Sequence, residues 1–120
     1  MPERRKLKRQ FLIYFGRVYD RQNGQTIGNL ADISVEGAMI ISNRAIDAGK
    51  VHLLRLDLPE EVFKIDHIDL DAQSIWCRPD IDPALYNVGF QLINMDPDRT
   101  SMIELLIKQY GIRESKSLSN

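Results

Sequence analysis

The chain has 120 residues, of which 43% are hydrophobic and 28% are charged, as in an ordinary globular domain. This length fits one domain with a real hydrophobic core. No apolar run approaches the ~18 residues of a membrane helix, and the charged start lacks the apolar stretch of a signal peptide. We therefore expect a cytoplasmic protein without membrane insertion, and the single cysteine, Cys77, agrees with a reducing compartment.

The net charge of −1 conceals two regions of opposite sign. Residues 1–9 carry five basic residues and one acid, a net charge of +4, whereas the other 111 residues carry 11 basic residues and 16 acids, a net charge of −5. Binding along a nucleic acid needs basic residues spread over a face, which an acidic body does not offer. The split therefore favours either a local anion site or a solvated tail.

Residues 1–9 are predicted to form a flexible basic arm, because they are polar and terminal. A β-rich run of aromatic and branched residues begins at Gln10 and ends at the turn signal Asn23-Gly24. Further strands are predicted over residues 25–33, 37–42 and 51–58.

A long alternating stretch opens with Phe63 and Ile65 and continues through Ile68, Leu70, Ala72, Ser74 and Trp76. The parity of these apolar positions slips by one between Ile65 and Ile68, which predicts a β-bulge or a bend there. A last strand is predicted from Tyr86 to Leu92, where apolar and polar residues alternate cleanly.

The end of the chain has helical signals instead. Asp96 can cap free backbone N–H groups, Pro97 suits the first helical position, and Gly111 is a natural stop. Several short strands followed by one helix predict a small antiparallel barrel or sandwich with a C-terminal helix.

Two motifs carry the functional signal: Arg5-x-x-x-Arg9 in the arm, and Asp32-x-Ser34-x-x-Gly37 in the first half of the body. A guanidinium group can form two parallel hydrogen bonds to a phosphate or to the O6/N7 edge of guanine. A hydroxyl can donate to phosphate or to a base edge, and a glycine lets a ligand approach the backbone or allows a positive φ. Together these groups suit an anionic ligand that bears a purine.

In this order, and on a β-rich chain, the two motifs resemble the signature of the PilZ domain family, R-x-x-x-R followed by [D/N]-x-S-x-x-G. Ile75-Trp76 and Gly89-Phe90 are also similar to the family, and the resemblance covers roughly residues 4–110. It implies a six-stranded antiparallel β-barrel over residues 10–95 and a C-terminal helix over 96–111, which leaves residues 112–120 as a disordered tail.

The resemblance also implies a bacterial receptor for cyclic di-GMP rather than an enzyme. It carries over five positions as ligand-binding residues: Arg5, Arg9, Asp32, Ser34 and Gly37. Asp32 can accept hydrogen bonds from guanine N–H groups or hold an arginine in place, and the sequence leaves both roles open. The receptor would change the conformation of its arm on binding and so signal to a downstream protein partner.

Two further residues are candidates for the same site. Arg4 adjoins the arginine motif and can contact a phosphate or add local positive charge. Trp76 is the lone tryptophan; it can pack against a guanine or under an arginine, and the alternative is that it belongs to the core.

Other functional classes have weaker support. His52 and His67 lack partners at metal spacing, so neither a metal site nor a cofactor is expected. No nucleophile elbow or phosphate-binding loop is present in the sequence. A PilZ-fold interaction domain that binds no nucleotide is the alternative function, and the acidic body disfavours a single-strand nucleic-acid binder. A monomer or weak dimer is expected.

Overall fold

The structure, a computed structural model, describes residues 10–12, 16–59 and 63–113. In this part of the chain, eight strands and one helix follow one another. They are β1 (Gln10–Leu12), β2 (Arg17–Asp20), β3 (Thr26–Ile33), β4 (Gly37–Ser42), β5 (Val51–Asp57), β6 (His67–Pro79), β7 (Tyr86–Ile93), α1 (Pro97–Tyr110) and β8 (Gly111–Arg113).

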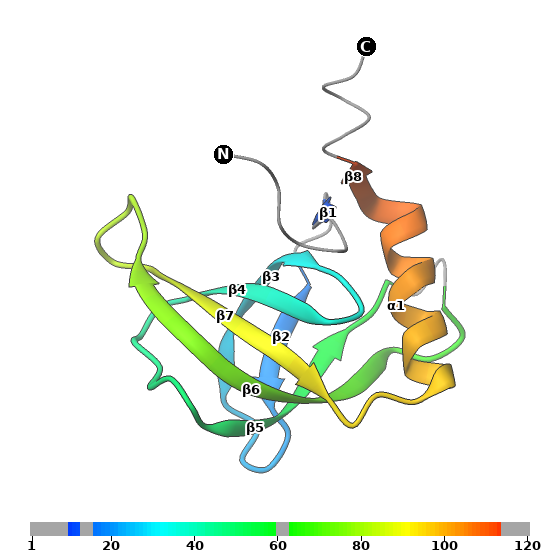
Figure 1. The fold of residues 1–120 in the computed structure, drawn as a ribbon, viewed down its shortest axis with the longest axis horizontal. Coiled ribbons are helices and arrows are strands. Elements are labelled where there is room, and N and C mark those ends of the chain that lie inside the picture. The colour runs from blue at the N-terminus through cyan, green and yellow to red at the C-terminus, as the bar shows by residue number, and fades with distance from the viewer. Residues whose placement is uncertain (1–9, 13–15, 60–62, 114–120) are drawn as a thin grey trace.

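Six of these strands close into an antiparallel barrel, with α1 standing beside the end of β7 (Figure 1). Around the barrel the order is β2-β5-β6-β7-β4-β3, and β3 pairs back with β2 to complete the ring. The prediction of a six-stranded antiparallel barrel followed by one helix is therefore confirmed. The two remaining strands lie outside the ring: β1 pairs with β3 on one side and with β8 on the other.

The barrel interior is filled by alternate side chains of the strands. In β4, for example, Ala38, Ile40 and Ser42 are buried while the residues between them are only partly covered. Ile103 and Leu106 of α1 add to the same core, and both are 1% exposed or less. The helix therefore owes its position to an apolar stripe that it buries, as the spacing of its hydrophobic residues indicates.

The helix begins as the sequence predicts, because the Asp96 carboxylate accepts a hydrogen bond from the Arg99 N–H at 2.8 Å. It ends at Tyr110, one residue before the expected end, and Gly111 starts β8. β8 was not predicted, and its residues 112 and 113 were expected to open a disordered tail. Its strand partner, β1, comes from the far end of the chain, so local sequence gives no signal for it.

A bend is present where the apolar parity slips, as predicted: residues 64–66 form a bend before β6, and the regular alternation begins only at His67. A bulge that was not predicted lies further along, where the register with β7 shifts between Ser74 and Trp76. Ser74 is opposite Phe90, whereas Trp76 is opposite Gly89, so Ile75 is the extra residue. Because of this bulge, Trp76 leaves the inward-facing set that its parity predicts.

In the described ranges, no helix is long and apolar enough to cross a membrane. The same ranges hold no group of three or more His, Cys, Asp or Glu side chains that could bind a metal ion.

Candidate functional site

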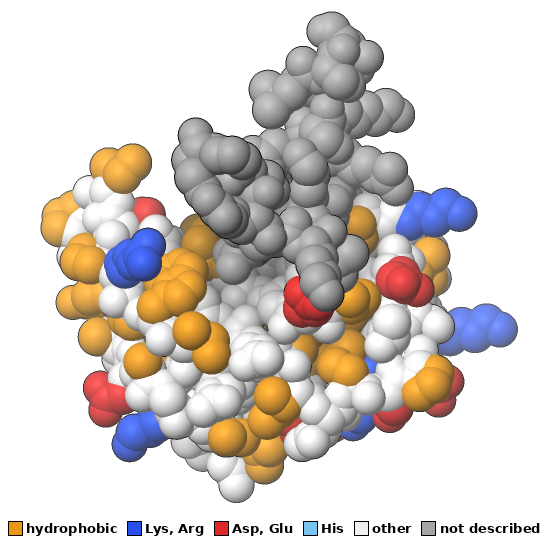
Figure 2. Space-filling model, in the orientation of Figure 1, with side chains coloured by type: hydrophobic (Ala, Val, Ile, Leu, Met, Phe, Trp, Pro, Cys, Tyr) orange, Lys and Arg blue, Asp and Glu red, His pale blue; other side chains and the backbone are white. Residues whose placement is uncertain are grey.

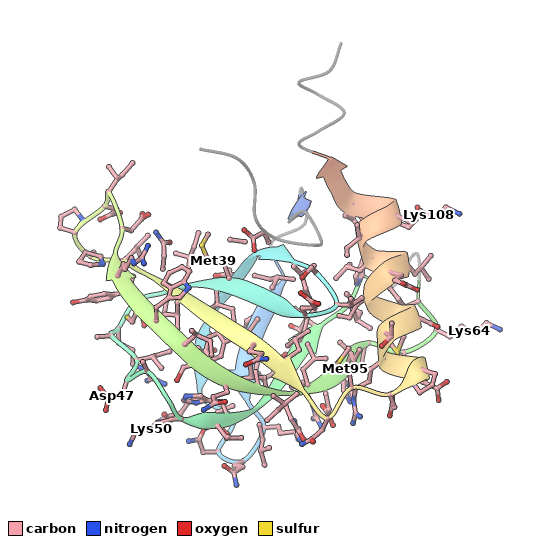
Figure 3. The ribbon with its side chains drawn as sticks, viewed as in Figure 1. Met39, Asp47, Lys50, Lys64, Met95 and Lys108 are labelled. Carbon is pink, nitrogen blue, oxygen red and sulfur yellow. The ribbon has the colours of Figure 1, made fainter. Side chains whose placement is uncertain are left out.

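A depression of about 550 Å³ lies on the outer face of the barrel, between the β3–β4 turn and strands β6 and β7. Pockets for small ligands commonly span about 300–1,000 Å³. Its lining includes three residues of the second motif and Gln91, which is opposite Gly37 in the β4–β7 pairing: Ser34, Glu36, Gly37 and Gln91. Trp76 and Gly89, which are opposite each other in the β6–β7 pairing, also line it. Figure 3 marks this face, with Met39 toward the β6–β7 hairpin and Met95, a lining residue, beside the start of α1.

Ser34 shapes the turn that forms one wall of the depression. Its hydroxyl oxygen accepts hydrogen bonds from the N–H groups of Glu36 at 3.2 Å and Gly37 at 3.3 Å. Its own N–H donates to the Gly37 carbonyl at 2.8 Å, which closes the hairpin. A serine hydroxyl also has one hydrogen to donate, and no described group accepts it. Ser34 can therefore fix the turn and still offer a donor to a ligand.

Gly37 is required by close packing between two strands. A Cβ atom at this position would lie 2.8 Å from the carbonyl oxygen of Phe90, which is too close for real carbon–oxygen contacts. Gly37 is not among the positive-φ glycines, which are Gly24 and Gly49 in the described ranges. Of the two roles that the sequence allows, the close approach of backbone is the one observed, and it keeps this wall of the depression low.

Trp76 belongs to the outer face and not to the core. Its ring packs on Gly89, where a Cβ atom would come within 2.3 Å of the indole. The ring is half-buried and lines the depression. The guanidinium carbon of Arg78 lies 4.9 Å from the ring centroid, so the tryptophan does pack under an arginine.

Asp32 stands behind the site and does not line the depression. It pairs with Met39 of β4 and with Phe11 of β1, and it is only 3% exposed. A ligand in the depression could therefore contact the Asp32 carboxylate only if the groups that cover this side chain moved.

The three arginines of the arm, Arg4, Arg5 and Arg9, lie outside the described residues. The described part of the chain still shows where the arm is attached. In the antiparallel pairing of β1 with β3, Gln10 is opposite Ile33 and Phe11 is opposite Asp32. The chain therefore enters β1 at the end of β3 that leads to Ser34.

The depression itself carries little positive charge. Its lining includes the acid Glu36 but no lysine or arginine among the described residues. The carboxyl groups with shifted pKa values lie elsewhere on β6. Hydrogen bonds from Arg55 to Asp69 and from Arg21 to Asp71, both 2.8 Å, lower the pKa of each carboxyl.

Sequence reasoning did not single out Arg78 or Gln91. The signal for Arg78 was its spacing of two from Trp76, which places both side chains on one face of a strand. The signal for Gln91 was the same spacing from Gly89 in β7. These spacings could not be interpreted before the bulge at Ile75 was known. The regular alternation of β6, continued without a bulge, directs Trp76 into the barrel.

Comparison with known proteins agrees with this architecture. The family model described as PilZ domain matches residues 3–109. No curated protein matches the chain. The PilZ domain of YcgR from Escherichia coli, solved with c-di-GMP, is 15% identical with a TM-score of 0.68, and the match covers 98% of this chain and 96% of that one.

Two longer proteins have the same fold in part. The inhibitor of motility MotI/DgrA of Bacillus subtilis is 15% identical with a TM-score of 0.68, over 90% of this chain and 52% of that one. The YcgR chain solved in complex with c-di-GMP is 16% identical with a TM-score of 0.68, over 89% and 46%. This chain thus spans about half the length of both proteins. Since the family model matches most of its residues, the chain belongs to the PilZ domain family.

Proposed function

We propose that this protein is a receptor for cyclic di-GMP that binds the nucleotide between its basic arm and the outer face of the barrel. The observation that carries the proposal is the depression that Ser34, Gly37 and Trp76 line together. Ser34 and Gly37 belong to one motif and Trp76 comes from a distant strand, and each was expected to contact the ligand. The YcgR PilZ domain, which has the same fold, was solved with this nucleotide.

The pairing of β1 with β3 supports a role for the arm. Arg9 is bonded directly to Gln10, and Gln10 is opposite Ile33, the residue before Ser34. Arg5 is five residues before Gln10, and five residues of fully extended chain span at most ~18 Å. Both guanidinium groups of the motif can therefore reach the depression, which needs cations from outside its own lining to hold an anion.

In this proposal each residue has a distinct task. Arg5 and Arg9 bind phosphate or the guanine edge with their two-pronged guanidinium groups. Ser34 donates its free hydroxyl hydrogen, and Trp76 offers a ring face for stacking. Asp32 acts from behind by holding a cation, because a carboxylate that is 3% exposed is poorly placed to meet a base directly.

Arg4 adds a further cation beside the motif. Nothing in these roles activates a nucleophile or transfers a proton, so we propose a receptor and not an enzyme. Ordering the arm over the nucleotide costs conformational entropy, which the new contacts must exceed. The surface made by arm, ligand and barrel is then recognised by a protein partner.

Calorimetric titration with cyclic di-GMP tests the proposal. We expect micromolar or tighter binding, and the stoichiometry reports how many nucleotides occupy the site. Arg5→Ala and Arg9→Ala should each weaken binding by about 1.5–3 kcal/mol, the value of a charged hydrogen bond. Lys6→Ala and Lys8→Ala are matched controls, because they remove the same charge from the same arm.

The controls separate a motif from a general electrostatic effect. Equal losses in all four variants would show that the arm contributes only its charge. Absence of heat with the unmodified protein would reject the proposal and leave the alternative, a PilZ-fold interaction domain that binds no nucleotide.

A further inference from the structure

The position of Arg78 on Trp76 is not explained by the fold alone. Arg78 is exposed, and its guanidinium carbon lies 4.9 Å from the centre of the indole ring. The ring also packs on Gly89, so the glycine and the guanidinium group both contact it. A purine that stacks on Trp76 would compete with Arg78 for the ring.

Most other arginines whose side chains the structure describes have carboxylate partners, and exposed Arg44 is the exception. Arg21 donates to Asp71 and Arg55 donates to Asp69, each at 2.8 Å. The guanidinium group of Arg99 in α1 lies 3.0 Å from the carboxylate of Asp96, just before the helix. Arg78, in contrast, has no ion pair with any residue that the structure describes, and its one recorded contact is the ring.

The depression beside Trp76 needs such a cation. Its described lining contains Glu36 and no basic side chain, so a dianionic ligand there would meet one negative charge and no positive one. Figure 2 shows hydrophobic side chains gathered over the β6–β7 hairpin with a basic side chain in their midst. The guanidinium group of Arg78 is held on Trp76, which itself lines the depression.

We propose that Arg78 is a binding residue for the nucleotide and also occupies the stacking face of Trp76 while the site is free. When cyclic di-GMP arrives, the guanidinium group leaves the ring and binds a phosphate, and a guanine takes its place on the indole. This inference rests on the proposed function and adds to it a third type of arginine contact, one that comes from the barrel rather than from the arm.

The exchange is physically reasonable because the two contacts of Arg78 differ in strength. An exposed cation–π contact is weak, whereas two parallel charge-assisted hydrogen bonds to a phosphate are among the strong interactions of a guanidinium group. The indole loses no packing in the exchange, since a guanine covers the face that Arg78 vacates. A lysine could replace the charge but not the planar, two-pronged contact.

The test uses the single tryptophan of the chain as its probe. Titration of Arg78→Ala with cyclic di-GMP, by calorimetry and by Trp76 fluorescence, should give a dissociation constant about tenfold or more above that of the unmodified protein. Arg78→Lys should recover only part of this loss. The emission of the free Arg78→Ala protein should already differ from that of the unmodified protein, because the ring has lost its cover.

Arg44→Ala is the matched control. Arg44 is also exposed, it has no ion pair with a described residue, and it does not line the depression. Its removal should leave the dissociation constant within twofold. Thermal unfolding of all variants shows whether a change in affinity comes from loss of fold.

The outcomes distinguish this inference from the proposed function. If the unmodified protein binds and Arg78→Ala binds equally well, Arg78 only covers the tryptophan and this inference is wrong while the receptor function stands. If Arg78→Lys binds as well as the unmodified protein, the planar contact is wrong. If the unmodified protein does not bind, both proposals fail.

Discussion

The two halves of β6 use charged and aromatic side chains in opposite ways. In the first half, Asp69 and Asp71 face outward and are held by Arg55 and Arg21. In the second half, after the bulge, Trp76 and Arg78 contact each other, and no described carboxylate pairs with the arginine. The first half is thus held together by ion pairs between strands, whereas the second half has a cation–π contact within one strand, which is where we propose that the ligand binds.

Removal of Arg21 should have the largest effect on folding. Its guanidinium group donates to the Leu54 carbonyl at 2.9 Å and to Asp71 at 2.8 Å, so it ties the β2–β3 turn to β5 and β6. We expect Arg21→Ala to lower the free energy of unfolding by about 2–3 kcal/mol, since charged hydrogen bonds contribute ~1.5–3 kcal/mol each and these groups keep some contact with water.

Urea denaturation measures this loss, with the exposed Arg44→Ala as control. The affinity for cyclic di-GMP should stay unchanged in the folded fraction. If Arg21→Ala weakened the affinity for cyclic di-GMP and left the stability unchanged, the first half of β6 would serve binding and not stability.

A methyl group at Gly89 should affect the second half without unfolding the barrel. The added Cβ would meet the indole ring of Trp76 and displace it from the depression. We expect Gly89→Ala to lose about 1–3 kcal/mol of binding free energy, which is the usual contribution of a base stacked on an aromatic ring.

Trp76→Ala should lose the same amount as Gly89→Ala. The double variant separates a shared cause from two independent ones, because losses that arise from one displaced ring do not add. Calorimetry on the three variants gives the comparison. Full additivity would mean that Gly89 acts on binding by some route other than the ring.

Acid should reduce the stability that the ion pairs in the first half of β6 provide, and this is the smallest of the expected effects. The pKa values of Asp69 and Asp71 are lowered from an ordinary value of 3.8, by hydrogen bonds from Arg55 and Arg21 respectively. The native state therefore releases protons more readily than the unfolded state. The stability from these pairs is present above pH 3.8 and is lost as the pH falls through the lower native pKa values.

The measurement is the free energy of unfolding between about pH 6 and pH 2, compared with that of Asp71→Asn, whose profile should be flatter in the acid limb. His52 is separable, because burial lowers its pKa from 6.5, so the stability that depends on its neutral form is present above pH 6.5 and starts to be lost as the pH falls below that value, before the aspartates titrate. An acid limb that is identical in both proteins would contradict the role of Asp71.

Much of the barrel could be predicted because its signals are local. Clean alternation predicted β7, the short apolar run over residues 37–42 predicted β4, and Asp96 with Pro97 predicted the start of α1. The bulge could not be located, because a bulge is defined by the register with a neighbouring strand. Only the pairing of Ser74 with Phe90 and of Trp76 with Gly89 shows that Ile75 is the extra residue.

The candidate site was predictable in part for the same reason. Ser34 and Gly37 were identified by a motif, and the structure places both in the wall of one depression. The burial of Asp32 and the contact of Arg78 with Trp76 depend on strands that are distant in sequence. The roles of Arg4, Arg5 and Arg9 stay predictions, since these residues lie outside the described ranges.

The pairing of β1 with β8 has a consequence for the order of folding. Gln10 and Arg113 are paired, although about 100 residues separate them in sequence. Contacts of such long range are entropically costly to form early, so we expect this short ladder to form last and to open first. Native-state hydrogen exchange would show β1 amides exchanging ahead of those in β4 and β7. The segment that joins the arm to the barrel is then also its most readily released strand, and a ligand that closes the arm would slow this local unfolding.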